Sequence, residues 1–272
     1  MNEFFHYLQA EMEEPGLFSW FHLIVIILVT AVTILVSVFF KDAKEKTYKR
    51  ILFIFWMIAI ILSVIRQTMR AFHYGPPSYW QYSLKEIPFA LCSMIYYFTP
   101  MIIFINKEKH PKIVDMANGY ICLISLLAGV VVCLYSNMAA SKQVFINYQT
   151  FIHHGIQVVI GVYVYVYNRR NITIKTFYRS LIAFIVTVGI AIIINVSCYP
   201  NYVNFFFINP MFITDLPVGN IIQEKAGYPV YLLVYIVAIS LATYITYLSL
   251  TGIYKLVLHR KEKSNKKANE IS

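Results

Sequence analysis

Seven long apolar runs constrain the fold of this 272-residue chain more than any other feature. They are Phe21–Phe40, Ile51–Ile65, Ile87–Ile105, Val114–Leu134, Phe151–Tyr167, Phe177–Val196 and Tyr228–Leu248. Most approach the roughly 20 residues that a helix needs to cross a bilayer, and we expect the shorter second helix to continue through Arg70. Hydrophobic residues make up 59% of the chain and charged residues 13%, too much apolar surface for a soluble domain to bury. We therefore expect an all-α, polytopic membrane helical bundle with about seven transmembrane helices.

The basic residues alternate between the loops. Of the 23 Lys and Arg residues, 18 lie in four segments, 41–50, 106–112, 168–179 and 255–272. The positive-inside rule then predicts an outside N-terminus and a cytoplasmic C-terminus. The net charge of +10 reflects this topology and does not indicate a nucleic-acid partner. We expect one transmembrane domain over residues 1–258 and a basic cytoplasmic tail over 259–272.

Polar residues gather at the predicted outer ends of four helices. These residues are Arg66, Gln67, Arg70, Cys92, His153, His154, Asn195, Asn201 and Tyr202. Ionisable groups at membrane depth usually face a bundle interior or a water-filled cavity. Their shared depth predicts one outward-facing site, which would bind membrane phospholipids.

Two arginines in the second run share one helix face. Ser63, Arg66, Gln67 and Arg70 follow the spacing i, i+3, i+4, i+7. Guanidinium groups one turn apart favour binding of a phosphate. The alternative is that both side chains snorkel to the membrane interface.

Cys92 is the candidate nucleophile. We expect it about one turn inside a helix that begins near Pro88, a residue suited to a first turn. Tyr96 lies one turn further on, on the same face, and would supply a hydroxyl. A lone membrane cysteine is, however, most often a small buried hydrophobic residue.

The pair His153 and His154 supplies the candidate base. Neighbours on a helix point about 100° apart, so only one faces a given partner well. His154 shares a polar or small face with Gln157 and Gly161, whereas His153 shares one with aliphatic residues. The pattern favours His154 as the inward residue. Adjacent histidines lack the i, i+4 spacing of metal ligands, so we expect neither metal nor cofactor.

Four elements of the chain together resemble a known family. They are the segments 87–92 (IPFALC), 151–155 (FIHHG), Asn201-Tyr202 with Asn209-Pro210, and 227–231 (GYPVY). They resemble the YwaF-like family of bacterial integral membrane proteins, which is related to transmembrane protein 164, an acyltransferase of ether-phospholipid synthesis. The resemblance implies a six- to seven-helix bundle in a bacterial plasma membrane. It further implies Cys92 as nucleophile and His153 or His154 as base.

Three functions fit these residues. The first is an acyltransferase that moves an acyl chain from a phospholipid to a lysophospholipid at the outer leaflet through a Cys92 thioester. There, Arg66, Arg70, Gln67, Tyr96, Gln157, Asn195, Asn201 and Tyr202 would bind the substrate, with Asn195 and Asn201 as candidate oxyanion donors. The second is a lipid hydrolase with the same Cys/His site. The third is a transporter or receptor that binds an anionic headgroup, in which Cys92 only packs.

Overall fold

The fold is a bundle of long helices, as seen in a computed structural model that describes residues 2–135 and 140–271. Within these residues, six helical segments are long and apolar enough to cross a membrane. They comprise α2 (Trp20–Phe40), α3 (Glu45–Ala71), the segment Pro111–Leu134, α7 (Val144–Asn168), α8 (Ile174–Ser197) and Tyr228–Arg260 of α10 (Tyr228–Ile271). The predicted all-α membrane bundle is confirmed.

The predicted seventh span over Ile87–Ile105 is helical only from Cys92 onward. A 3₁₀ turn, η2 (Cys92–Met94), leads into α4 (Ile95–Phe104), and the two form one short apolar helix. The residues before Cys92 form a loop that contains the 3₁₀ turn η1 (Leu84–Glu86). The loop forms because its backbone groups bond locally: the N–H of Phe89 donates to the carbonyl of Ile87 (2.7 Å).

The segment Pro111–Leu134 is not a uniform α-helix. It consists of α5 (Pro111–Gly119), a π-helical stretch η3 (Tyr120–Ser125) and α6 (Leu126–Leu134). All six residues of the π-helical stretch are buried. Stretches of this kind often occur near functional sites. Here the stretch packs against α4, α5, α7, α8 and α10, at the centre of the bundle.

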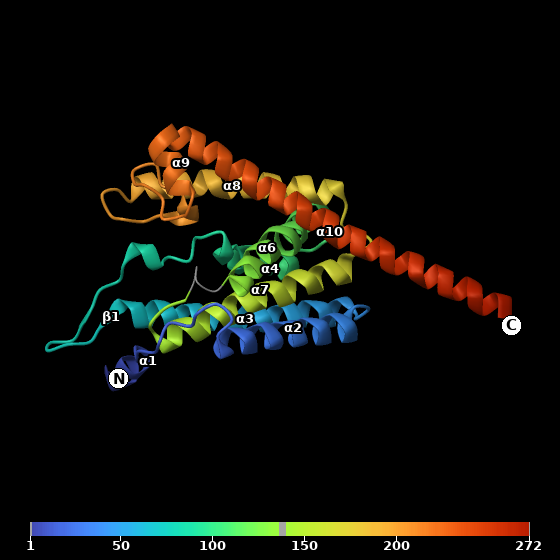
Figure 1. Ribbon diagram of the computed structural model, residues 1–272, viewed down its shortest axis with the longest axis horizontal. Coiled ribbons are helices and arrows are strands. Elements are labelled where there is room, and N and C mark those ends of the chain that lie inside the picture. Colours follow the sequence, from blue (N-terminus) through green and yellow to red (C-terminus); the bar gives the residue numbers. More distant parts are fainter. Residues whose placement is uncertain (1, 136–139, 272) are drawn as a thin grey trace.

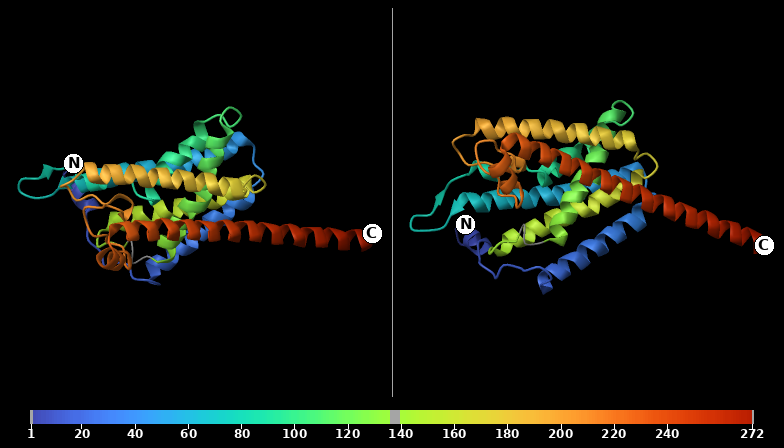
Figure 2. Two further views of the ribbon diagram at one scale, coloured as in Figure 1. Left: turned by 90° about the horizontal axis from the view of Figure 1, so that it is seen from above. Right: turned by 45° about the horizontal axis from the view of Figure 1, so that its top comes forward.

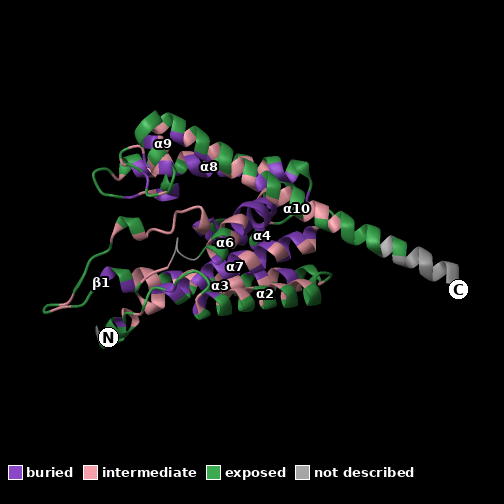
Figure 3. Ribbon diagram, viewed as in Figure 1, coloured by how far each residue is buried: buried purple, intermediate pink, exposed green. Residues whose placement is uncertain are grey.

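The helix α7 forms the inner wall of the bundle. It packs against α2, α3, α6 and η3, while α8 and α10 lie on the opposite side of α4 and α6 (Figures 1 and 2). Buried residues concentrate in these central helices, and α2 and α10 are mostly exposed along their length (Figure 3). In a membrane these exposed aliphatic surfaces face lipid.

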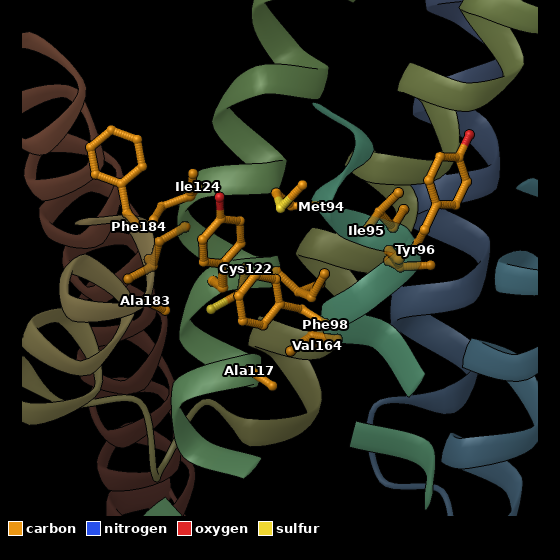
Figure 4. Close-up of a cluster of buried hydrophobic side chains, with 14 of the residues drawn as sticks. Met94, Ile95, Tyr96, Phe98, Ala117, Cys122, Ile124, Val164, Ala183 and Phe184 are labelled. Atoms are coloured by element: carbon orange, nitrogen blue, oxygen red, sulfur yellow. The ribbon is translucent and has the colours of Figure 1, made fainter. Parts of the chain in front are cut away.

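An apolar core closes the bundle next to α4. Figure 4 shows Phe98, Cys122, Val164 and Phe184 within it, contributed by four different helices. The hydroxyl of Tyr96 points away from this core (Figure 4). Tyr96 therefore connects the apolar core to the polar groups described below.

The remaining elements lie mainly at one end of the bundle. They are α1 (Asn2–Leu8), the hairpin of β1 (Phe72–His73) and β2 (Tyr79–Trp80), the 3₁₀ turn η5 (Phe205–Phe207) and α9 (Gly219–Ala226). The basic loops after α2, α4 and α7 lie at the other end, from which α10 projects (Figure 2). The helix α10 continues without a break through the predicted domain boundary at 258 and ends at Ile271, and residue 272 lies outside the described residues.

Candidate active site

Cys92 is the first residue of the helix formed by η2 and α4. The expectation that it lies one turn inside a helix starting near Pro88 is wrong, because Pro88 belongs to the preceding loop. The carbonyl of Pro88 instead accepts a hydrogen bond from the hydroxyl of Tyr97 (3.2 Å). Cys92 therefore lies where a helix presents its unpaired N–H groups.

The backbone carbonyl of Cys92 binds two side chains of α7. It accepts hydrogen bonds from His153 Nε2 (3.2 Å) and from Gln157 Nε2. Gln157 Oε1 in turn lies 2.8 Å from His154 Nδ1. These contacts join Cys92 to a helix more than 50 residues further along the chain.

The same carbonyl determines the tautomers of both histidines, because a carbonyl oxygen can only accept hydrogen bonds. His153 must carry its proton on Nε2, and its Nδ1 then accepts from the hydroxyl of Tyr96 (3.0 Å). Gln157 must turn its NH₂ group toward the carbonyl, so its Oε1 accepts from a proton on His154 Nδ1. His154 is left with an unprotonated Nε2. Of the two imidazoles, only that of His154 keeps a free lone pair.

The expectation that only His154 of the two histidines faces the site is wrong. Both histidines are buried and both line the cavity that contains Cys92. The helix-face argument failed for His153 because the carbonyl of Cys92 accepts from both His153 and Gln157, which are four residues apart and share one face of α7. The tautomer argument leaves His154 as the histidine of this pair with a free ring nitrogen.

A cavity of about 550 Å³, here called the Cys92 cavity, contains these groups. Its wall includes Cys92, Ser93 and Tyr96 from η2 and α4, together with Gln149, Thr150 and both histidines from α7. Aromatic residues of η5, Phe205 and Phe207, form part of another wall. The cavity thus combines a thiol, an imidazole and apolar surface.

Cations dominate the charge around this cavity. Arg66, Arg70 and Lys85 line it, and Glu86 is the one carboxylate among its lining residues. Glu86 Oε2 lies 3.5 Å from Arg66 Nη2, so it partly neutralises that arginine. Arg70 and Lys85 form no ion pair with any residue in the described ranges 2–135 and 140–271. The net positive charge favours an anionic ligand.

A second cavity of about 510 Å³, here called the vestibule, adjoins the first. Arg70, Lys85, Glu86 and Tyr202 line both cavities, and Asn201 lines the vestibule alone. The hydroxyl of Tyr202 donates to Asp215 Oδ2 (2.6 Å), and this bond raises the pKa of Tyr202 above its ordinary value. The phenol between the two cavities therefore stays protonated at neutral pH.

Four of the predicted substrate-binding residues do not line the Cys92 cavity. Gln157 is fully buried, and its amide binds Cys92 and His154. Gln67 faces a different surface, where its Oε1 accepts from Tyr82 (2.8 Å). Asn195 is fully buried, and both ends of its amide bind the backbone of Phe205 (3.0 and 2.9 Å). Asn195 therefore cannot reach an oxyanion in the Cys92 cavity, which it does not line. Asn201 is displaced into the vestibule.

The loop after α8 is held against the cavity by residues of the elements that carry the family resemblance. Asn209 Nδ2 donates to the carbonyl of Val203 (2.5 Å). The hydroxyls of Tyr228 and Tyr231 donate to the carbonyls of Ile208 and Phe207 (2.9 and 2.7 Å). These bonds fix Phe207 in a left-handed conformation (φ 61°), which a non-glycine residue adopts only at a cost. Phe205 and Phe207 of this loop form part of the cavity wall.

Two cavity residues escaped the sequence analysis. Glu86 precedes the element at 87–92, and its pairing with Arg66 depends on the loop conformation. Gln149 lies four residues before His153, which places it one turn away on the same helix face. This spacing was a usable signal, because Gln149, His153 and Gln157 form one polar stripe along α7.

Among the residues that the structure describes, no group of three or more His, Cys, Asp or Glu side chains is arranged to hold a metal ion. The chemistry available in the Cys92 cavity is that of a thiol, an imidazole and hydrogen-bond donors. These groups suffice for covalent acyl transfer.

Comparison with known proteins identifies the family to which this chain belongs. No curated protein and no solved structure matches this chain. A family model described as the TMEM164 family matches residues 17–247. The match covers the candidate spans from α2 to the first half of α10, the Cys92 cavity and the loop that covers it. This multi-pass membrane protein belongs to the TMEM164 family.

Proposed function

We propose that the protein is a phospholipid acyltransferase that transfers an acyl chain through a thioester on Cys92. One observation carries the proposal: Cys92 and His154, from separate helices, line one cavity whose wall also holds Arg66, Arg70 and Lys85. A nucleophile, a base and a cationic wall are the groups that acyl transfer from a lipid with an anionic phosphate requires.

His154 is the proposed base. Its free Nε2 takes the proton of Cys92 Sγ, and the thiolate attacks the carbonyl carbon of an acyl ester. The C–O bond then breaks, and His154 returns the proton to the oxygen of the departing lysophospholipid. A second lysophospholipid reverses these steps: His154 removes its hydroxyl proton, its oxygen attacks the thioester, and the thiolate leaves. Gln157 holds His154 in the required tautomer, so it is a positioning residue and not part of the substrate site.

The phosphate of the lipid is assigned to Arg70 and Lys85. Both line the Cys92 cavity and the vestibule, and neither has a carboxylate partner among the described residues. Arg66 is a weaker candidate because Glu86 lies beside it. A phosphate at the junction of the two cavities leaves its acyl ester free to extend toward Cys92. Tyr202 lies at the same junction.

The distribution of basic residues supports an outer-leaflet substrate. The basic loops lie at the end of the bundle away from the Cys92 cavity (Figure 2). If that end is cytoplasmic, as the positive-inside rule predicts, then the cavity opens toward the outer leaflet. Phospholipids of that leaflet are the proposed donor and acceptor.

The decisive experiment detects the thioester and the transfer together. The protein is placed in phosphatidylethanolamine nanodiscs whose acyl chains carry an isotope label, and deuterated lysophospholipid is added. We expect a labelled acyl group on Cys92 in the peptide mass map and labelled, deuterated phospholipid as product. Cys92→Ser should abolish both signals. Cys198→Ser is the matched control, because Cys198 is also half-buried and free but does not line the cavity.

The alternatives give different results in the same experiment. Release of labelled fatty acid that does not depend on lysophospholipid would identify a hydrolase. The absence of both the Cys92 adduct and the product, in protein that binds phospholipid equally well with Cys92→Ser, would refute the acyltransferase and favour a binding protein.

A further inference from the structure

Gln149 is a buried amide without a partner in the cavity wall. Its side chain is 2% exposed and lines the Cys92 cavity. Its Oε1 is sealed from solvent and has no hydrogen-bond partner among residues 2–135 and 140–271. None of the side-chain hydrogen bonds of the described residues involves Gln149, whereas Gln157, two turns along the same helix face, uses both ends of its amide.

An unpartnered buried amide is unfavourable unless something binds it. Burying an amide without hydrogen bonds destabilises the folded protein. If Gln149 served packing alone, a methionine at this position would give a more stable protein, because methionine has a similar length and no buried amide that needs hydrogen bonds. Oε1 can only accept a hydrogen bond, so the end of Gln149 that can bind an anion is Nε2, which also makes no hydrogen bond among the described residues. Gln149 lies one turn before His153 in the wall of the cavity, so the partner of Nε2 is then an acceptor that enters the cavity.

Cys92 itself offers a second donor. As the first residue of its helix, its N–H lacks an intrahelical partner. Within the described residues no carbonyl accepts a hydrogen bond from this N–H. The neighbouring N–H of Ser93, in contrast, is bound to the carbonyl of Ala90 (2.9 Å). A helix N-terminus also favours negative charge.

We infer that Gln149 and the N–H of Cys92 form the oxyanion hole of the proposed acyl transfer. The inference rests on the proposed function and assigns the donors that Asn195 and Asn201 cannot provide. When Cys92 Sγ bonds to the acyl carbon, the π electrons of the carbonyl move onto its oxygen. Gln149 and the Cys92 N–H donate to this oxyanion until the ester C–O bond breaks and the carbonyl re-forms. The thiol proton is held on His154 throughout this interval.

The test compares acylation of Cys92 with alkylation of the same thiol. Acylation passes through an oxyanion, whereas alkylation by iodoacetamide displaces iodide and forms none. Gln149→Met keeps the length of the side chain and removes the donor. We expect the single-turnover rate of thioester formation to fall about 10²- to 10³-fold, as for other oxyanion-hole donors. The rate of Cys92 alkylation should stay within about twofold of wild type, and the KM for the lipid donor should change little.

A structural role for Gln149 predicts the opposite pattern. If its amide only stabilises the bundle, Gln149→Met should lower the thermal midpoint and leave the acylation rate per folded molecule unchanged. Gln9→Met is the matched control, since Gln9 Nε2 donates to the carbonyls of Met69 and Phe72 (3.1 and 2.8 Å) outside the Cys92 cavity. It should lower the thermal midpoint without affecting acylation of the folded protein.

The outcomes separate the two proposals. An unchanged acylation rate in Gln149→Met, with an active and Cys92-dependent wild type, would overturn the oxyanion hole alone. A parallel fall in acylation and alkylation would also overturn it, because the defect would then lie in thiol reactivity. If wild type forms no Cys92 thioester while alkylation proceeds, the proposed function itself fails.

Discussion

Gly129 is the position at which a single methyl group should most directly disturb the candidate site. Gly129 on α6 packs against α7 directly behind His154 and Gln157. A Cβ at this position would lie 2.8 Å from Gln157 Cβ and 2.8 Å from the carbonyl oxygen of His154. Ordinary contacts begin at 3.4 Å, so the helices must separate by about 0.6 Å. Overpacking of this kind typically costs about 1–3 kcal/mol.

The displacement also reaches the chemistry. The backbone that Gly129→Ala would push carries both the proposed base and the amide that holds it against Cys92. Misplacement by about 1 Å can reduce a rate about 100-fold, so a shift of roughly half that size should reduce the acylation rate about tenfold. We expect a lower thermal midpoint in detergent together with a slower single-turnover acylation of Cys92.

Two other glycines provide matched controls. A Cβ at Gly161 would lie 2.7 Å from Leu126 Cβ in the same helix interface, but away from the bonds to Cys92. Gly161→Ala should therefore lower stability and leave acylation of the folded protein unchanged. A Cβ at Gly189 meets nothing within 4 Å, and Gly189→Ala should be neutral or slightly stabilising. The reasoning is refuted if Gly129→Ala matches Gly189→Ala in both stability and acylation rate.

Three further predictions follow from the hydrogen bonds. Tyr96→Phe removes the donor to His153 Nδ1 and should lower the free energy of unfolding by about 1–3 kcal/mol. It should leave the acylation rate within a few-fold of wild type, because His154 is the proposed base. A loss of acylation as large as that of His154→Ala would contradict this assignment. Asn195→Ala removes both bonds to the backbone of Phe205, so limited proteolysis should cut the loop after α8 faster, and unchanged cleavage would show that other contacts hold the loop. Asp115→Asn weakens the ion pair with Arg179 of α8 at the far end of the bundle. It should lower the thermal midpoint without slowing acylation. Slower acylation would reveal coupling between the two ends of the bundle.

The fold class could be predicted because apolar runs of membrane-spanning length admit few structures. In a bilayer each backbone polar group must be satisfied internally, so such runs form helices. The prediction failed for the span over Ile87–Ile105, since periodicity and hydropathy do not show where a loop satisfies its own backbone groups. The start of the helix at Cys92 depends on the turn at Ile87–Phe89 and on Tyr97 binding the carbonyl of Pro88.

The candidate site could be predicted in part. Depth along each helix placed Cys92, His154 and Arg70 together, because topology alone determines which helix ends lie on the same side. Gln67 and Asn195 lie at the same depth but face elsewhere, since depth says nothing about which neighbour a side chain meets. The pairing of Glu86 with Arg66 became visible only when α3 and the loop before Cys92 were packed around one cavity, whereas the spacing of Gln149 from His153 was already a signal in the sequence.

The sequence by itself therefore determined the bundle, the end of the bundle that holds the polar groups, and the thiol and imidazole that define the chemistry. These follow from local length, hydropathy and charge. Tertiary structure alone decided which imidazole keeps a free lone pair, which amides are already bound and which remain unpartnered. Those properties depend on the carbonyl of Cys92 meeting His153 and Gln157 of α7, a contact between segments about 60 residues apart that no local pattern encodes.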